Sequence, residues 1–222
     1  MNKTGFIFDL DGVIVDTAKY HFLAWKKLAG ELDIEFTEKD NERFKGVSRK
    51  RCLEILLEMG RIKASEEQFS AWLIEKNEDY LAYIDTMDES EILPDVPKVL
   101  KYLKSHKIPM ALGSASKNAG PILEKVNLLS YFDTLVDGNS VTKAKPDPEV
   151  FLIAAERLGV KPEHCVVFED ALAGIEAANS AGMISIGIGE ANVLTAAKFN
   201  FVDFTEIDSE FLDSLINRNE GR

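Results

Sequence analysis

The amino-acid sequence predicts an α/β fold, with a parallel-sheet core domain and an inserted all-α cap domain. Short apolar runs such as residues 6–8 recur along the 222-residue chain and are bounded by charged or turn residues, as is typical of strands buried on both faces of a parallel sheet. Helical patterns alternate with these runs in the C-terminal part, whereas residues 37–85 contain helical patterns and no convincing strand. We therefore expect a Rossmann-like core domain from residues 1–15 and 93–222, and a helical cap domain from residues 16–92.

The first predicted strand, residues 6–8, is followed at once by two aspartates. Because side chains alternate along a strand, Asp9 and Asp11 leave its C-terminal end on the same side. Two carboxylates in one small space repel each other unless a cation lies beside them, and Gly12 leaves the approach to them open. A solvated loop with a turn glycine is the alternative interpretation, but the position directly after a buried strand favours a metal site.

The bulk composition limits the partners that we expect. The formal net charge is -12, from 38 acidic and 26 basic residues, which argues against nucleic acid or an anionic membrane as a partner. A few local donors can still bind a small phosphate. There is no run of about 18 apolar residues and no signal peptide, and Cys52 and Cys165 lack a metal-ligand spacing. We expect a cytoplasmic monomer with two reduced thiols.

A helix is expected after the aspartate loop, with Asp16 or Thr17 as its N-cap. His21, Trp25 and Leu28 recur on one face of this helix. A histidine on an apolar helix face is most often a satisfied core residue. A functional role for this histidine is the alternative.

The cap is expected to continue with helices joined by polar loops. The sequence Gly-Val-Ser-Arg at residues 46–49 interrupts two helical segments, and Ser48 can cap the second of them. Taken alone, Arg49 is explained as a solvated arginine near the start of a helix. We expect the cap to hinge where the chain crosses to the core, near residues 14–17 and 86–93.

A longer cap helix is predicted from Ser65, which begins the capping-box sequence Ser-Glu-Glu-Gln. Its stripe of apolar residues, from Phe69 to Ile84, is interrupted by Lys76. The lysine either extends its amine to solvent, or this face of the helix closes over an anionic ligand. The sequence leaves both interpretations open.

The predicted strand at residues 110–113 is followed by Ser114-Ala-Ser-Lys-Asn118. Small residues at the C-terminal end of a strand leave backbone N–H groups available to an anion. A serine-rich turn that caps the next helix is the alternative.

A strand at residues 134–137 and a helix from about residue 148 to 158 enclose the loop Lys143-Ala-Lys145-Pro146. The proline stiffens this loop, although a surface lysine is the default interpretation of both lysines. A cis Lys145-Pro146 peptide bond would aim Lys145 inward from the turn, and we state it as a hypothesis.

Another buried strand, residues 165–168, ends in Glu169 and Asp170, and later strands are expected at residues 184–188 and 201–203. This arrangement repeats the opening one, an apolar strand followed by carboxylates. In open α/β sheets ligands bind outside the carboxyl ends of the strands. The side chains expected to converge there are Asp9, Asp11, Ser114, Lys145, Glu169 and Asp170.

The segment FDLDGVIVDT, residues 8–17, resembles the first motif of the haloacid-dehalogenase-like (HAD) phosphotransferases, and nearly the whole chain is similar to the β-phosphoglucomutases among them. The resemblance implies that Asp9 is the nucleophile that takes a phosphoryl group and that Asp11 is the general acid/base. It also implies that Lys145, in the Lys-Pro motif, neutralises the phosphoryl oxygens and the nucleophile, with Lys143 as the alternative.

Mg²⁺ is the expected cofactor, because the available ligands are hard oxygens without a Cys or His cluster. The family pattern implies carboxylate oxygens from Asp9 and Asp170, the backbone carbonyl of Asp11, and support from Glu169. The side chain of Asp11 then stays free for acid/base work.

The resemblance also implies how a small phosphorylated sugar is bound. Arg49 binds the phosphate group that lies far from the reacting phosphate. Ser114 binds the phosphoryl group that is transferred, and Ser116 and Asn118 face the sugar. His21 lies at the hinge and helps to place the general acid. The expected substrate-binding residues are Thr17, His21, Trp25, Gly46, Val47, Ser48, Arg49, Lys76, Ser114, Ala115, Ser116, Asn118 and Lys145.

Three functions are therefore compared. The resemblance implies a mutase that converts β-D-glucose 1-phosphate to glucose 6-phosphate through an aspartyl-phosphate enzyme and a β-glucose 1,6-bisphosphate, which requires two anion sites. A Mg²⁺-dependent sugar-phosphate phosphatase shares the core chemistry but requires one anion site. A non-catalytic phosphometabolite-binding module is expected to have lost Asp9 or Asp11, and both are present.

Overall fold

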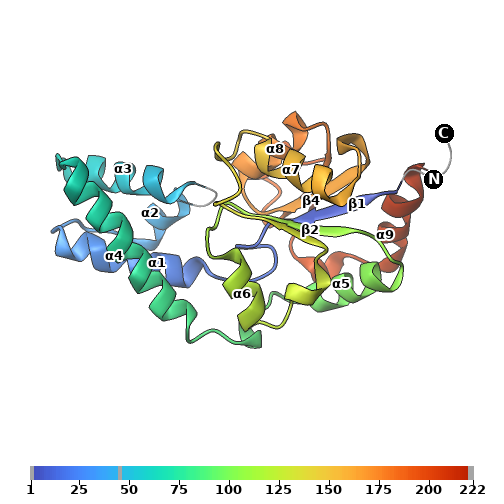
Figure 1. The fold of residues 1–222 in the computed structure, drawn as a ribbon, viewed down its shortest axis with the longest axis horizontal. Coiled ribbons are helices and arrows are strands. Elements are labelled where there is room, and N and C mark those ends of the chain that lie inside the picture. The colour runs from blue at the N-terminus through green and yellow to red at the C-terminus, as the bar shows by residue number, and fades with distance from the viewer. Residues whose placement is uncertain (1–2, 45–46, 220–222) are drawn as a thin grey trace.

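The computed structural model describes residues 3–44 and 47–219, which form a parallel sheet, helices on both of its faces, and a separate group of helices (Figure 1). The strands are β1 (Gly5–Phe8), β2 (Met110–Gly113), β3 (Thr134–Val136), β4 (Cys165–Glu169), β5 (Ile184–Ile188) and β6 (Phe199–Phe201). The α-helices are α1 (Ala18–Glu31), α2 (Glu38–Glu42), α3 (Arg49–Gly60), α4 (Glu66–Ile84), α5 (Val96–Ser105), α6 (Ala119–Lys125), α7 (Glu149–Leu158), α8 (Leu172–Ser180) and α9 (Ser209–Ile216). Short 3₁₀ helices span Glu89–Glu91, Leu129–Tyr131, Pro162–His164, Phe204–Glu206 and Asn217–Asn219.

The strands form one parallel sheet in the order β3-β2-β1-β4-β5-β6. The first strand lies between β2 and β4, so that Phe6 pairs with Met110 on one side and with Val166 on the other. The chain adds strands on one side of β1 and then crosses to the other side. The carboxyl ends of β1, β2 and β4 therefore meet where the strand order reverses, which is where open α/β sheets bind ligands. The predicted fold class is confirmed.

Alternation along the strands divides the core between the two faces of the sheet. Phe6 and Phe8 belong to the apolar cluster that α5, α6 and α9 cover, whereas Ile7 belongs to the opposite cluster with residues of α7 and α8. Figure 1 shows α7 and α8 on one side of the sheet and α5, α6 and α9 on the other. Because both faces are covered, the strands are apolar at nearly every position, as the sequence prediction required.

The last strand differs from its prediction. It spans Phe199–Phe201 instead of residues 201–203, and it pairs with the end of β5. Phe199 and Phe201 both contact the ring of Phe211 in α9, with centroids 5.3 and 4.9 Å from it. Val202 is 67% exposed and does not continue the strand. Packing of the Phe-x-Phe pair against α9 fixes the position of this strand.

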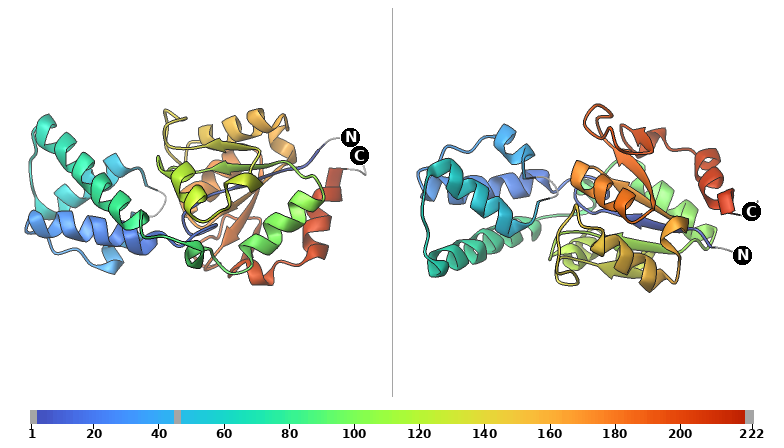
Figure 2. Two further views of the ribbon diagram at one scale, coloured as in Figure 1. Left: turned by 60° about the horizontal axis from the view of Figure 1, so that its bottom comes forward. Right: turned by 90° about the horizontal axis from the view of Figure 1, so that it is seen from above.

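Helices α1 to α4, which we call the cap helices, form a group that lies to one side of the sheet in all views (Figures 1 and 2). Helix α4 packs against α1 and α3 around an apolar cluster of their own, which includes Trp25, Leu28 and Leu56. The capping box predicted at Ser65 is present, because Ser65 Oγ accepts from Gln68 N at 3.2 Å and Gln68 Oε1 accepts from Ser65 N at 3.0 Å. The cap helices thus have an apolar cluster of their own, whereas Tyr20, Ala24, Tyr80 and Ile84 of α1 and α4 belong to the cluster of the sheet.

Two chain segments connect the cap helices to the sheet, and they are paired with each other. Asp16 N donates to Glu91 O at 2.9 Å, and Leu93 N donates to Ile14 O at 3.0 Å. Val15 and Ile92 form an antiparallel bridge between these bonds. The two crossings thus act as one backbone-bonded connector.

Cys52 and Cys165 are both buried free thiols, as expected. Burial raises the pKa of each thiol to about 12, which makes both unreactive as nucleophiles. Among the helices of the described residues, none combines the length and apolar character needed to cross a bilayer.

Removal of the buried Phe204 ring tests the apolar cluster on the face of the sheet that α5, α6 and α9 cover. Phe204 is fully buried, and its ring centroid lies 5.3 Å from that of Phe168 and 6.4 Å from that of Phe8. We expect Phe204→Ala to lower the free energy of unfolding by about 3 to 5 kcal/mol, measured by urea denaturation. Phe199→Ala, at a half-buried ring, is the control and should cost clearly less. Equal losses would contradict this description of the core.

Candidate active site

A buried lysine joins two carboxylates at the end of the sheet. Lys145 Nζ donates to Asp9 Oδ1 and to Glu169 Oε1, each at 2.5 Å. Asp9 directly follows β1, Glu169 ends β4, and Lys145 comes from the loop between β3 and α7. All three residues are at least nine-tenths buried. The Lys145-Pro146 peptide bond is cis, as hypothesised.

Local packing holds Glu169 in this position. Its second oxygen, Oε2, accepts from Ala171 N at 2.9 Å just before α8 begins. Gly174, in the first turn of α8, lies so close that a Cβ there would be 1.8 Å from Glu169 Oε1. The helix can approach the carboxylate because this position has no side chain.

The charges in this group depend on one another. Burial opposes the charged form of Lys145, but the carboxylates of Asp9 and Glu169 outweigh burial and hold the pKa of Lys145 above its usual range. Burial also raises the pKa of Glu169, although the ammonium of Lys145 counteracts this. The lysine is therefore a permanent cation beside the carboxylate of Asp9.

The serine-rich loop after β2 lies at the same end of the sheet. Ser114 is fully buried, and its Oγ accepts from Ser116 N at 3.0 Å, while Ser116 Oγ accepts from Asn118 N at 3.2 Å. The expectation that these backbone N–H groups are available to an anion is wrong for Ser116 and Asn118, because the serine hydroxyls accept from them. Each hydroxyl keeps its own hydrogen for donation. Ala115 lies between them and is half-buried.

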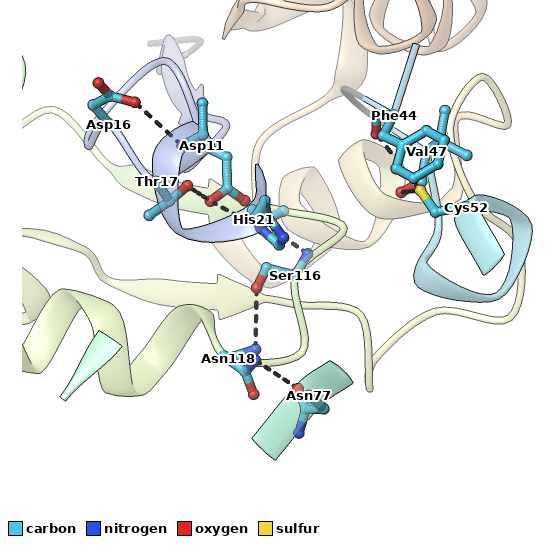
Figure 3. A network of polar contacts seen from close by, with 12 residues as sticks. Asp11, Asp16, Thr17, His21, Phe44, Val47, Cys52, Asn77, Ser116 and Asn118 are labelled. Carbon is cyan, nitrogen blue, oxygen red and sulfur yellow. Dashed lines mark hydrogen bonds and ion pairs between the residues drawn. The ribbon is translucent and has the colours of Figure 1, made fainter. Parts of the chain in front are cut away.

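Asp11 faces the cap helices. Thr17 Oγ1 donates to Asp11 Oδ1, and His21 Nε2 lies 3.9 Å from the same oxygen (Figure 3). Thr17 occupies the N-cap position of α1 but makes no side-chain capping bond; Asp16 Oδ1 instead accepts from Ala18 N at 3.2 Å. Thr17 uses its hydroxyl to hold Asp11.

His21 is paired with Lys76, which excludes one of the two interpretations of Lys76 that the sequence left open. Lys76 Nζ lies 3.0 Å from His21 Nδ1 and is 1% exposed, so the interpretation that its amine reaches solvent is wrong. When Lys76 is charged, its ammonium can only donate, so that Nδ1 accepts and Nε2 carries the ring hydrogen on the side of Asp11. The ring of His21 also stacks on Tyr80, with centroids 4.2 Å apart.

Charge and burial shift the pKa values of this second group. Burial and the nearby Asp9 raise the pKa of Asp11 to about 6, against the lowering effect of the Thr17 hydroxyl. Burial lowers the pKa of Lys76 to about 7, and Arg49 adds to this effect. Burial, Lys76 and Arg49 together lower the pKa of His21 well below its usual range, so the imidazole is neutral near pH 7.

Arg49 begins α3 and is half-buried, with Val47 and Ser48 beside it. Burial lowers its pKa, and its charge acts on both His21 and Lys76. Ser48 caps α3 by accepting from Arg51 N at 3.4 Å, as predicted. Gly46, which was predicted to bind substrate, lies outside the described residues.

Trp25 lines the same part of the cap helices. The Nζ of Lys76 lies 4.9 Å from the centroid of the Trp25 ring and 4.6 Å from that of Tyr80. Aromatic faces stabilise a cation that has left water. Lys76 is thus held between two rings and a histidine.

The chain matches known proteins along most of its length. Residues 3–182 match the family model described as haloacid dehalogenase-like hydrolase. The chain belongs to this family. A β-phosphoglucomutase of Bacillus subtilis is 40% identical over 208 residues, which cover 93% of this chain and 92% of that protein. A crystal structure of β-phosphoglucomutase from Clostridium difficile superposes with a TM-score of 0.92 at 40% identity, covering 99% of this chain and 100% of that chain.

Phosphatases are also among the relatives of this HAD family member. A phosphorylated carbohydrates phosphatase of Thermotoga maritima is 38% identical over 179 residues, which cover 80% of this chain and 81% of that protein. Sequence identity alone therefore separates the mutases from the phosphatases poorly.

A metal ion fits the acidic end of the sheet in this HAD family member. Asp9, Glu169 and Asp170 each place a carboxylate oxygen within 4.8 Å of the others. Gly12, with φ +78°, permits this arrangement, since a Cβ there would be 2.2 Å from Asp170 Oδ2. Hard oxygen donors of this kind suit Mg²⁺. The Asp11 carboxylate is not part of this group, and the prediction had assigned only the backbone carbonyl of Asp11 to the metal.

Two residues that the sequence did not single out as site residues lie at this site. Tyr80 stacks on His21 and could have been found, because it lies four residues after Lys76 on the same face of α4. Asn77 accepts a hydrogen bond from Asn118, and no sequence pattern indicated it.

Gly174→Ala tests the close approach of α8 to Glu169. The added methyl group should displace Glu169 from Lys145, lower the activity at least tenfold, and destabilise the fold by about 1 to 3 kcal/mol. Gly30→Ala is the control, because nothing lies within 4 Å of a Cβ at that position in α1. It should retain activity and be slightly more stable. Activity assays and thermal unfolding of both variants check this, and full activity of Gly174→Ala would contradict it.

Proposed function

We propose that this HAD enzyme is a β-phosphoglucomutase, which converts β-D-glucose 1-phosphate to glucose 6-phosphate through a phosphorylated Asp9 and a β-glucose 1,6-bisphosphate. Two separate cationic sites support the proposal. One is Lys145 at the carboxyl end of the sheet, which we call the sheet end, and the other is formed by Lys76 and Arg49 in the cap helices. A bisphosphate intermediate requires both.

The cap cations differ from ordinary buried charges. Across the parts of the chain that the structure describes, no carboxylate forms an ion pair with Lys76 or Arg49, although Lys76 is almost fully buried. A buried cation without a counter-ion is costly, and its pKa falls, as is seen for Lys76. A phosphate dianion would supply the missing counter-charge. This favours an anionic ligand that reaches from the sheet end to the cap.

At the sheet end, Asp9 attacks phosphorus and takes the phosphoryl group. Lys145 holds Asp9 Oδ1 in place and offsets the charge that gathers on the phosphoryl oxygens. Asp9, Glu169 and Asp170 would hold Mg²⁺, together with the backbone carbonyl of Asp11. When bound, this ion supplies further neutralisation of the phosphoryl charge. Ser114, with its buried hydroxyl, would donate to a phosphoryl oxygen.

Asp11 is the proposed general acid/base. Protonated, it gives its hydrogen to the leaving sugar oxygen; ionised, it takes the hydrogen of the attacking hydroxyl. A pKa of about 6 suits both directions near neutral pH, because each form is then populated. Thr17 orients the carboxylate by its hydrogen bond, and His21 Nε2 lies 3.9 Å from the same oxygen on the cap side.

A sugar-phosphate phosphatase is the second candidate, and the relative from Thermotoga maritima supports it. The enzyme would be incubated with β-glucose 1-phosphate, Mg²⁺ and a trace of the bisphosphate, and followed by phosphorus NMR. Glucose 6-phosphate as the main product supports the mutase. Inorganic phosphate as the main product would establish the phosphatase.

Asp9→Asn and Asp11→Asn separate the two proposed carboxylate roles. Asp9→Asn should abolish both turnover and phosphoenzyme formation, because an amide is a far poorer nucleophile. Asp11→Asn should keep Mg²⁺ binding, since the backbone carbonyl remains, while the rate falls by about 10² to 10⁴. Steady-state kinetics and metal titration by calorimetry measure these effects. Appreciable turnover by Asp9→Asn would remove the central assignment.

Arg49→Ala separates the mutase from the phosphatase. Loss of the guanidinium removes a charge-assisted contact to the far phosphate, so mutase activity should fall by at least about 100-fold. Phosphoenzyme formation from acetyl phosphate should stay near the normal rate, because this donor has no far phosphate. Arg51→Ala, which removes an exposed arginine of α3 that pairs with Glu54 and Glu58, is the control and should keep both rates. Equal losses for Arg49→Ala in both reactions would instead assign Arg49 to general cap structure.

A further inference from the structure

A hydrogen bond joins the cap helices to the serine-rich loop of the sheet. Asn118 Nδ2 donates to Asn77 Oδ1 at 3.2 Å (Figure 3). Asn77 follows Lys76 in α4, and Asn118 directly precedes α6. The bonds from Lys125 to Asp85 O and from Asn127 to Glu89 instead involve the segment that follows α4 and leads to the connector. The Asn77 contact stands apart from the connector.

The Asn118 carboxamide has a donor end and an acceptor end, and the donor end is the one bonded to Asn77. An amide offers two N–H donors on one atom and a carbonyl oxygen on the other. With Nδ2 bonded to Asn77, the Oδ1 end points away from that contact. No group in residues 3–44 or 47–219 donates to Asn118 Oδ1. The orientation leaves an acceptor available to a ligand.

The backbone of Asn118 is also fixed, because Asn118 N donates to Ser116 Oγ, and Ser116 N donates to Ser114 Oγ. The remaining freedom of Asn118 is rotation of its side chain. Asn77 removes that freedom from the opposite side of the site. A side chain held at both ends can discriminate between ligands that differ in the direction of one hydroxyl, since a misplaced hydroxyl leaves the amide unpaired.

We propose that Asn77 is a positioning residue that holds the Asn118 carboxamide with its carbonyl oxygen toward the sugar, and thereby sets the preference for one hydroxyl configuration. The inference rests on the proposed function and on the expectation, implied by the family resemblance, that Asn118 faces the sugar of the substrate. Asn77 would then affect the preference among sugar epimers, and it would have no effect on phosphoryl transfer to Asp9.

The test measures the affinity of the Mg²⁺-loaded enzyme for glucose 6-phosphate and for its C2, C3 and C4 epimers, mannose, allose and galactose 6-phosphates. Titration calorimetry would compare wild type, Asn77→Ala and Asn77→Asp, with Glu78→Ala, at an exposed position of α4, as the control. We expect wild type and Glu78→Ala to prefer glucose 6-phosphate over at least one epimer by about tenfold or more. Asn77→Ala should reduce that ratio to about threefold or less.

Asn77→Asp distinguishes positioning from general structure. Aspartate keeps the acceptor for Asn118 Nδ2 and should restore the epimer ratio. Its negative charge lowers the affinity for all four sugar phosphates alike, which leaves the ratio unchanged. An unchanged ratio in Asn77→Ala, or a ratio that Asn77→Asp fails to restore, would overturn the inference. Phosphoenzyme formation from acetyl phosphate should be normal in every variant, and a loss in Asn77→Ala would also overturn it.

Different results would refute the inference about Asn77 and the mutase assignment. A wild-type enzyme that releases inorganic phosphate from β-glucose 1-phosphate would refute the proposed function, while the epimer ratios would still decide the role of Asn77. A wild-type enzyme that isomerises this substrate but binds all epimers equally would refute the inference alone.

Discussion

The ion pair between Lys145 and two buried carboxylates is the constraint on which the sheet end depends. Removing charges from water is costly, and the cost is offset only when the geometry is close and the remaining lone pairs are bonded. Here the ammonium bonds to Asp9 and Glu169 at 2.5 Å each, and the Ala171 N–H bonds to the other oxygen of Glu169. Asp170 adds a third carboxylate within 4.8 Å of these two. A divalent cation bound there would reduce the repulsion among the three carboxylates.

The cap helices have the opposite imbalance. Lys76 is withdrawn from water and Arg49 is half-buried, and burial together with the charge of Arg49 lowers the pKa of Lys76 to about 7. Cations held in this way attract an anion strongly, because little water or counter-charge must be displaced. The overall charge of -12 therefore says little about the ligand. In the proposed function, a phosphorylated ligand would lie between these cations and the acidic end of the sheet.

The strands and most helices could be predicted because their signals are local. The run Cys-Val-Val-Phe before Glu169 and the capping box at Ser65 each specify their own element. The position of β6 could not be found in this way, since packing of Phe199 and Phe201 on α9 decides it. Similarly, residue type suggested that Thr17 caps a helix, whereas its hydroxyl is used by Asp11 from an earlier loop. The environments of Lys76 and Asn77 depend on contacts to His21 and Asn118 respectively, which lie 55 and 41 residues away in the chain.

The two aspartates that open the site depend on different parts of the molecule, although only one residue lies between them. Asp9 is held by Lys145, a contact within the sheet end. Asp11 is held by Thr17, and the pairing of His21 with Lys76 directs a ring hydrogen toward it from the cap helices. A movement of the cap about the connector at Val15 and Ile92 would therefore disturb Asp11 and leave Asp9 in place. In such a movement the proposed nucleophile would keep its contact to Lys145, whereas the proposed acid/base would lose its contacts to the cap side. A ligand that contacts both Lys145 and the cap cations favours the cap position in which Asp11 keeps these contacts, because its binding energy is available only there.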